Sequence, residues 1–84
     1  MAKWSVYMVR CKDASLYTGI AIDVEKRIAK HNAGEGAKYT RSRLPVVLVW
    51  LEMVESESAA RVREAEIKTW SKMKKESLAT LISG

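Results

Sequence analysis

The chain has 84 residues, of which 48% are hydrophobic and 30% charged, and its formal net charge is +5. A chain of this length can build one small core, so we expect residues 1–84 to form a single domain and exclude a multidomain enzyme. The apolar run at residues 46–51 is far shorter than the roughly 20 residues of a membrane helix, and the lone Cys11 excludes an internal disulfide framework. We therefore expect a cytoplasmic protein without a membrane partner.

The excess of positive charge lies in two segments. Residues 26–43 carry six cations against Glu35, which gives +5, and residues 67–84 give +3. Residues 44–66, in contrast, sum to −3. Uneven basic charge indicates a face that binds a polyanion, while a solvated lysine-rich surface would give the same count.

The first half of the chain predicts a hairpin followed by a helix. Residues 4–11 and 16–20 are rich in β-branched and aromatic residues, and a short polar link separates them. Asp23 is a candidate N-cap for a helix that ends before Gly34. Arg27 and His31 are four residues apart, so they would project from one side of this helix. Residues 34–43 have no apolar period and predict a basic loop.

The second half predicts one strand and two helices. Residues 46–51 are apolar on both alternating faces, which is typical of a strand that helices cover on both sides. A helix would begin at Ser56 or Ser58 and end near Trp70, with Ser71 as the cap of another. The order β-β-α-β-α-α favours an α+β fold with helices packed on one small sheet. Because connections avoid crossing, we expect the strand order 2-1-3.

Four features follow one another along the chain. They are the triplet Ser5-Val6-Tyr7, the triplet Tyr17-Thr18-Gly19, Arg27 followed by His31, and an acidic helix at residues 63–68. In this order and spacing they resemble the GIY-YIG nuclease superfamily, and in particular its small stand-alone bacterial members, which are related to the N-terminal nuclease domain of the incision enzyme of excision repair. The resemblance runs from about residue 4 to residue 81.

The resemblance implies a three-stranded antiparallel sheet and hydrolysis of DNA phosphodiester bonds with one divalent ion, Mg²⁺ or Mn²⁺. It also implies which positions form the site: the two motif tyrosines, the family arginine, a histidine found in many members and the metal-ligating glutamate correspond to Tyr7, Tyr17, Arg27, His31 and Glu64. Gly19 would have a structural role, because a glycine within a strand marks a bulge or a close approach to the backbone.

Elementary chemistry suits these residue types. A forked, permanently charged guanidinium such as Arg27 can meet the charge that develops on a phosphodiester. Mg²⁺ keeps most of its waters, so the single carboxylate of Glu64 can hold it. Tyr7 as general base needs help from neighbouring cations, because ionising a phenol of ordinary pKa costs about 4 kcal/mol at neutral pH. Tyr17 would position the phosphate or the water, although the roles of the two tyrosines can be exchanged.

Two points stay open in the sequence. Helical periodicity does not distinguish Glu64 from Glu66, and only the spacing of the family motif favours Glu64. The strand register, which decides whether Tyr7 and Tyr17 share a face, cannot be read from the sequence.

We therefore expect a metal-dependent endonuclease that acts on DNA, with branched, damaged and single-stranded forms as candidate substrates. Phosphates would be gripped by basic residues in two segments, and an aromatic ring would stack on a base. These residues are Lys38, Tyr39, Arg41, Arg43, Lys72 and Lys74. The alternative is a nucleic-acid-binding module with little or no catalysis that works with a targeting protein partner. An interaction domain for an acidic protein ranks last.

Overall fold

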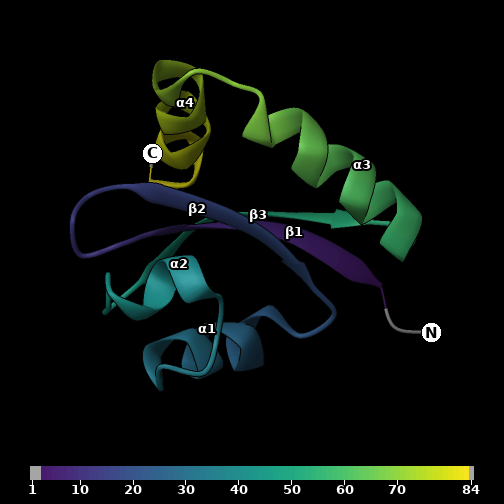
Figure 1. Ribbon diagram of the computed structural model, residues 1–84. Coiled ribbons are helices and arrows are strands. Elements are labelled where there is room, and N and C mark those ends of the chain that lie inside the picture. The colour runs from purple at the N-terminus through teal and green to yellow at the C-terminus, as the bar shows by residue number, and fades with distance from the viewer. Residues whose placement is uncertain (1–2, 84) are drawn as a thin grey trace.

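The computed structural model describes residues 3–83, with side chains described for residues 3–80. Strands β1 (Trp4–Arg10), β2 (Leu16–Ala21) and β3 (Val47–Val54) form an antiparallel sheet of order β2-β1-β3. Helices α1 (Val24–Asn32) and α2 (Lys38–Arg41) lie on one side of the sheet, and α3 (Glu57–Lys68) and α4 (Lys72–Ser83) lie on the other (Figure 1). The predicted α+β class, antiparallel sheet and strand order 2-1-3 are confirmed.

Helices α1 and α3 begin where polar side chains cap them. Asp23 Oδ1 accepts a hydrogen bond from the Lys26 amide at 3.0 Å, so Asp23 is the N-cap of α1. Ser56 Oγ accepts from the Ala59 amide at 3.1 Å, which makes Ser56 rather than Ser58 the N-cap of α3. Within the described part of the chain, no helix has the length and apolar character needed to cross a membrane.

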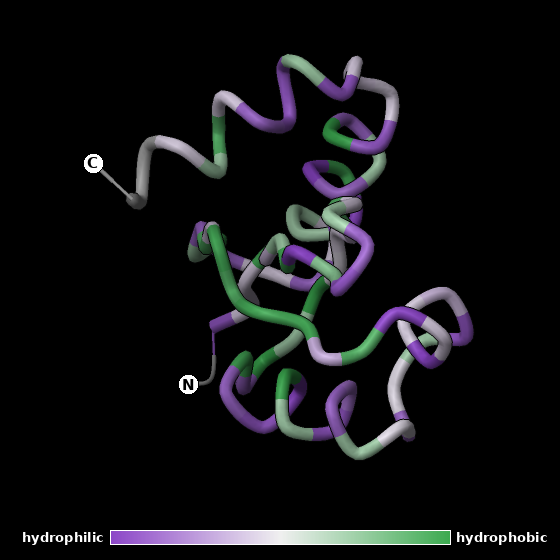
Figure 2. Tube along the Cα trace, turned by 90° about the vertical axis from the view of Figure 1, so that its left-hand side faces the viewer, coloured by the Kyte–Doolittle hydropathy of each residue, from purple (hydrophilic) through white to green (hydrophobic). Residues whose placement is uncertain are grey.

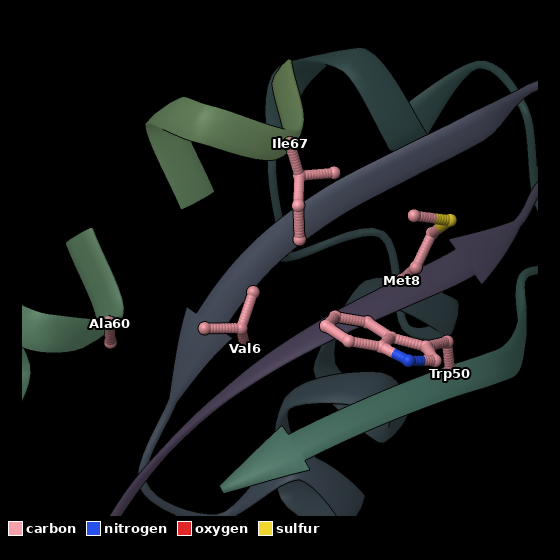
Figure 3. Close-up of a cluster of buried hydrophobic side chains, with 5 residues drawn as sticks. All are labelled: Val6, Met8, Trp50, Ala60 and Ile67. Atoms are coloured by element: carbon pink, nitrogen blue, oxygen red, sulfur yellow. The ribbon is translucent and has the colours of Figure 1, made fainter. Parts of the chain in front are cut away.

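The alternating residues of β1 build two cores. Val6 and Met8 pack toward α3 in a cluster with Trp50, Ala60 and Ile67 (Figure 3). On the opposite face Tyr7, Val9 and Cys11 pack in a second cluster with Ala21 and Val46. β1 is the central strand of the sheet and is buried on both faces. The orientation of its odd-numbered side chains is therefore fixed.

Asn32 fixes the position of α1 against the sheet. Its amide Nδ2 donates to the Val46 carbonyl at 3.1 Å, and its Oδ1 accepts from the Val46 amide at 2.8 Å. These two bonds join the end of α1 to the residue that precedes β3. They therefore hold in place the helix that carries Arg27 and His31.

Two expectations about the middle of the chain are wrong. The predicted loop at residues 34–43 contains the short helix α2, in which the amides of Thr40 and Arg41 bond to the Ala37 carbonyl. One helical turn is too short to show an apolar period in the sequence. The core-facing side chain of this turn is Thr40, a polar residue that is fully buried.

Strand β3 is also less covered than its apolar sequence predicts. Val47, Leu48, Leu51 and Met53 are 38–64% exposed, although Figure 2 marks the start of this strand as a long green, hydrophobic stretch. The physical reason is that β3 is an edge strand and that α1 has only nine residues. An apolar groove of about 550 Å³ between α1 and β3 remains open.

Candidate active site

The pairing of β1 with β2 brings the two motif tyrosines onto the same face of the sheet. Tyr7 lies opposite Gly19, and Val9 lies opposite Tyr17. A Cβ at Gly19 would come within 2.5 Å of Tyr7 Oη, so only glycine lets the Tyr7 ring lie across β2. A glycine in this strand predicts that another group comes close to its backbone. In the structure this group is the Tyr7 side chain, which lies against Gly19.

A chain of buried hydrogen bonds leads away from Tyr7. Tyr7 Oη lies 2.8 Å from His31 Nε2, and His31 Nδ1 lies 2.8 Å from Thr40 Oγ1. The Thr40 hydroxyl donates its single hydrogen to the Ala37 carbonyl at 2.9 Å, so it can only accept from His31. His31 therefore carries its proton on Nδ1, and its Nε2 accepts the Tyr7 hydroxyl proton. The network assigns one direction of proton movement, from Tyr7 toward His31.

Burial sets the protonation of this pair. It raises the pKa of Tyr7 to about 12, with the nearby Tyr17 acting in the same direction and Arg27 opposing it. Burial also lowers the pKa of His31, and the Arg27 guanidinium adds to that effect. At neutral pH both rings are accordingly uncharged, Tyr7 as donor and His31 as acceptor.

The depressed pKa of His31 predicts that the protein loses stability on mild acidification. Below the ordinary histidine pKa of about 6.5 the unfolded chain takes up a proton that the folded chain resists, so the free energy of unfolding should fall as the pH drops. Urea unfolding between about pH 7.5 and 5.5 measures this change. His31 is the only histidine, so a His31→Gln protein should lose most of the pH dependence. An identical slope in the two proteins would contradict the assignment.

Tyr17 has a more open environment than Tyr7. Its ring is half-buried, meets His31 edge-on at 5.6 Å and stacks with Tyr39 at 5.8 Å between ring centroids. Lys68 Nζ lies 5.9 Å from the same ring. The Tyr17 hydroxyl can therefore meet a ligand in the cleft, whereas the Tyr7 hydroxyl already donates its proton to His31.

The side chains predicted from the motifs meet in one hollow, which we name the central cleft. It has a volume of about 230 Å³ and extends past β2, between residues of α1 and α3. Tyr7, Tyr17 and Gly19 line it from the sheet, Arg27 from α1 and Glu64 from α3. His31 lies behind Tyr7 and lines a neighbouring hollow together with Tyr17 and Arg27. Residues from four separate segments are thus brought together.

Sequence reasoning missed four members of this site. Trp4, Ile20 and Arg61 also line the central cleft, and Thr40 orients His31. Arg61 precedes Glu64 by three residues on the same helix, a spacing that could have identified it. Trp4 and Thr40 are brought to the site by tertiary folding, and no local pattern marks them.

The structure distinguishes the two candidate glutamates. Glu64 lines the central cleft and forms an ion pair with Lys68 at 3.2 Å, whereas Glu66 is exposed and forms an ion pair with Arg63. The lining of the cleft contains no other carboxylate, and residues 3–83 hold no group of three or more His, Cys, Asp or Glu side chains arranged for a metal. A hard ion that keeps most of its waters fits a single carboxylate beside an open cleft.

The residues predicted to contact nucleic acid lie outside the central cleft. Lys38 and Arg41 are exposed on α2. Arg43 pairs with Asp13 at 3.0 Å and its guanidinium lies 3.9 Å from the centre of the Tyr39 ring, which also stacks with Tyr17. The Tyr39 ring thus packs against two side chains of the protein. At the start of α4, Lys72 lines a separate hollow and Lys74 lies over the Trp70 ring at 4.3 Å.

Comparisons with known proteins identify the family of the chain. The profile of the GIY-YIG catalytic domain matches residues 3–77. UPF0213 protein SH2523 of Staphylococcus haemolyticus is 63% identical over 75 residues, which cover 89% of this chain and 92% of that protein. UPF0213 protein HQ_3675A of Haloquadratum walsbyi is 58% identical over 74 residues, covering 88% of this chain and 83% of that protein.

Solved structures resemble the whole fold. The solution NMR structure of UPF0213 protein BH0048 from Bacillus halodurans has a TM-score of 0.62 and 46% identity, covering 98% of this chain and 87% of that chain. The NMR structure of protein EF2693 from E. faecalis has a TM-score of 0.63 and 35% identity, covering 92% of this chain and 82% of that chain. The chain therefore belongs to the GIY-YIG catalytic domain family, within the GIY-YIG nuclease superfamily, and resembles its small single-domain members.

Proposed function

We propose that the protein is a metal-dependent endonuclease that hydrolyses phosphodiester bonds of DNA. The observation that carries this proposal is the meeting of Tyr7, Tyr17, Arg27 and Glu64 around one open cleft. A base, a phosphate-positioning hydroxyl, a fixed cation and a carboxylate for a metal are the groups that hydrolysis of a phosphodiester requires.

Tyr7 and His31 supply the base. Ionising Tyr7 alone would cost about 7 kcal/mol at pH 7, given its raised pKa of about 12. When Tyr7 passes its proton to His31 Nε2, the proton moves only along an existing hydrogen bond, so the charges that form remain next to each other. As the oxygen of a water forms its bond to phosphorus, Tyr7 Oη takes one proton of that water and its own proton goes to His31.

Arg27 and Tyr17 bind and position the phosphate. As the bond between the water oxygen and phosphorus forms, the bond from phosphorus to the leaving oxygen breaks, and negative charge grows on the phosphoryl oxygens. Arg27 is exposed at the cleft, where its guanidinium can donate to two of these oxygens. Tyr17 positions the phosphate through its hydroxyl, since its ring is held by Tyr39 and His31.

Glu64 would hold the divalent ion, Mg²⁺ or Mn²⁺. Such an ion, when bound, neutralises charge on the phosphate and on the leaving oxygen. Lys68 pairs with Glu64 at 3.2 Å and can swing away, because half of its side chain is exposed. Lys68 then remains available to a phosphate oxygen.

This chain offers little surface for reading a base sequence. Both long helices pack on the sheet, and sequence readout requires an element inside a groove of the duplex. The proposed substrate is therefore selected by structure or damage. The proposed location of the activity is the cytoplasm.

A second candidate function is a nucleic-acid-binding module without catalysis that works with a targeting partner. The ion pair between Glu64 and Lys68 favours it, because the carboxylate in the cleft already has a cation beside it. A binding module would shift the mobility of DNA in a salt-dependent manner and leave every strand intact.

Incubation with supercoiled plasmid and with branched DNA separates the two functions. The endonuclease should nick DNA in Mg²⁺ or Mn²⁺ and stop in chelator. Arg27→Ala should lower the nicking rate by roughly 10²-fold, and Arg27→Lys should recover part of this loss, because lysine keeps the charge without the fork. Nicking that persists unchanged in Arg27→Ala would mean that the activity belongs to a contaminant. Binding without nicking in any of these metals would favour the module.

A further inference from the structure

Three hollows of the structure meet at Arg27. The central cleft is one, and a hollow of about 380 Å³ lined by Tyr17, His31 and Glu35 is the second. The third is a groove of about 410 Å³ beside the first turns of α1, which we name the α1 groove; its lining includes Trp4, Lys26, Arg27 and Lys30. Trp4 and Arg27 line both the central cleft and the α1 groove, so these two spaces adjoin one another.

The cations of the α1 groove are free to meet a ligand. Lys26, Arg27 and Lys30 are exposed, and none of them forms an ion pair within residues 3–83. The lining includes one acid, Asp23, whose carboxylate caps α1 through the Lys26 amide. Arg43, Arg10 and Arg63 are paired with acids. Lys38 and Arg41 on α2 are also exposed and form no ion pair among the described side chains, but they line neither the central cleft nor the α1 groove.

The charges around Arg27 favour one direction in which a strand of phosphates can leave the central cleft. On one side of Arg27 the α1 groove offers two further cations, Lys26 and Lys30, against one carboxylate, Asp23, which accepts a hydrogen bond from the Lys26 amide. On the other side Lys30 again lines the hollow, but the carboxylate of Glu35 lies there as well. A strand of phosphates extending from the central cleft is attracted toward Lys26 and meets a like charge at Glu35.

Trp4 marks the junction between the central cleft and the α1 groove. Its indole is half-buried, with one part packed against the core cluster of Val6 and Met8 and another part lining both spaces. An indole with a free surface beside unpaired cations is suited to stacking on a base while the cations hold the backbone.

We propose that the α1 groove binds the DNA strand next to the scissile phosphate, with Lys26 and Lys30 on flanking phosphates and Trp4 against the adjacent base. The inference rests on the proposed function for its substrate. It places the main DNA contact on α1, rather than on α2 or at the start of α4, where the sequence predicts it.

The test measures binding without cleavage. Fluorescence anisotropy with a labelled splayed-arm duplex is recorded in chelator at several salt concentrations, with the full chain and with Lys26→Ala, Lys30→Ala and the double variant. Each lysine that neutralises a phosphate should reduce the slope of log affinity against log salt by about 0.9 on duplex DNA, or about 0.7 on single strands. The matched control is Lys12→Ala, an exposed lysine in the β1–β2 hairpin, which should keep the slope and the affinity of the unchanged chain.

The Trp4 contact is tested separately, with Trp4→Leu, which keeps an apolar side chain in the core and removes the aromatic plane. Binding should weaken roughly 5- to 100-fold. Circular dichroism establishes that the variant is folded, and Trp50→Leu, which removes an indole from the same core cluster outside the cleft, is the control for packing.

The outcomes separate this inference from the proposed function. If the unchanged chain nicks DNA but the Lys26 and Lys30 variants bind like Lys12→Ala, the α1 groove is not the DNA path and the proposed function stands. If the chain binds through Lys26 and Lys30 but nicks no DNA, the groove stands and the proposed endonuclease falls. An absence of DNA binding by the unchanged chain would overturn both.

Discussion

Replacing Tyr7 by phenylalanine is expected to lower the rate of DNA cleavage by a factor of roughly 10² to 10⁴, the contribution typical of a positioned acid or base. The substitution removes the hydroxyl that is hydrogen-bonded to His31 Nε2, and it leaves the buried ring in the core. Single-turnover cleavage of a labelled duplex in Mn²⁺ measures the loss, and affinity in chelator should remain close to that of the unchanged protein.

The control for this experiment is Tyr39→Phe. It removes the same hydroxyl from a ring at the protein surface, and the stacking of that ring with Tyr17 is kept. Cleavage by Tyr39→Phe should stay within a few-fold of the original rate. Tyr7→Phe also leaves His31 Nε2 without its partner, which is expected to cost about 1–3 kcal/mol of stability, so the assay is run well below the melting temperature. Full activity of folded Tyr7→Phe would exclude Tyr7 as the base.

Much of this fold could be predicted because its signals are local. Asp23 and Ser56 start helices through bonds to amides three residues later. The sequence offers Asp23 directly as a cap, and it limits the cap of the later helix to Ser56 or Ser58. The exposure of Leu51 on β3 could not be predicted, because it depends on how far a neighbouring helix reaches. Apolar composition reports what a strand can bury, and the tertiary structure decides what covers it.

The candidate site was predictable in its residue types and unpredictable in its connections. The motif spacing identified Tyr7 and Tyr17, but only the strand register places them on one face. The role of Thr40 depends on a contact with His31 across a turn that has no sequence signal. Tyr39 lies in a basic segment that predicts contact with bases, and its stacking with Tyr17 in the folded chain has no signal in the sequence.

We propose that Glu64, and not the nearby Glu66, supports metal-dependent cleavage in the central cleft. The two residues are on the same helix, two positions apart, but only Glu64 lines the cleft, while Glu66 pairs with Arg63 at the surface. Glutamine has nearly the same shape as glutamate and lacks the charge that a divalent ion requires. Glu64→Gln should therefore lower cleavage by at least roughly 10³-fold, the several kcal/mol that a bound metal contributes.

The most direct measurement is the rate of plasmid nicking in Mg²⁺ and Mn²⁺ by Glu64→Gln and Glu66→Gln side by side, with DNA affinity measured in chelator. We expect that Glu64→Gln binds DNA at least as tightly as the unchanged chain and does not nick it, and that Glu66→Gln nicks at nearly the original rate. Equal nicking by the two variants, or a loss confined to Glu66→Gln, would contradict this proposal.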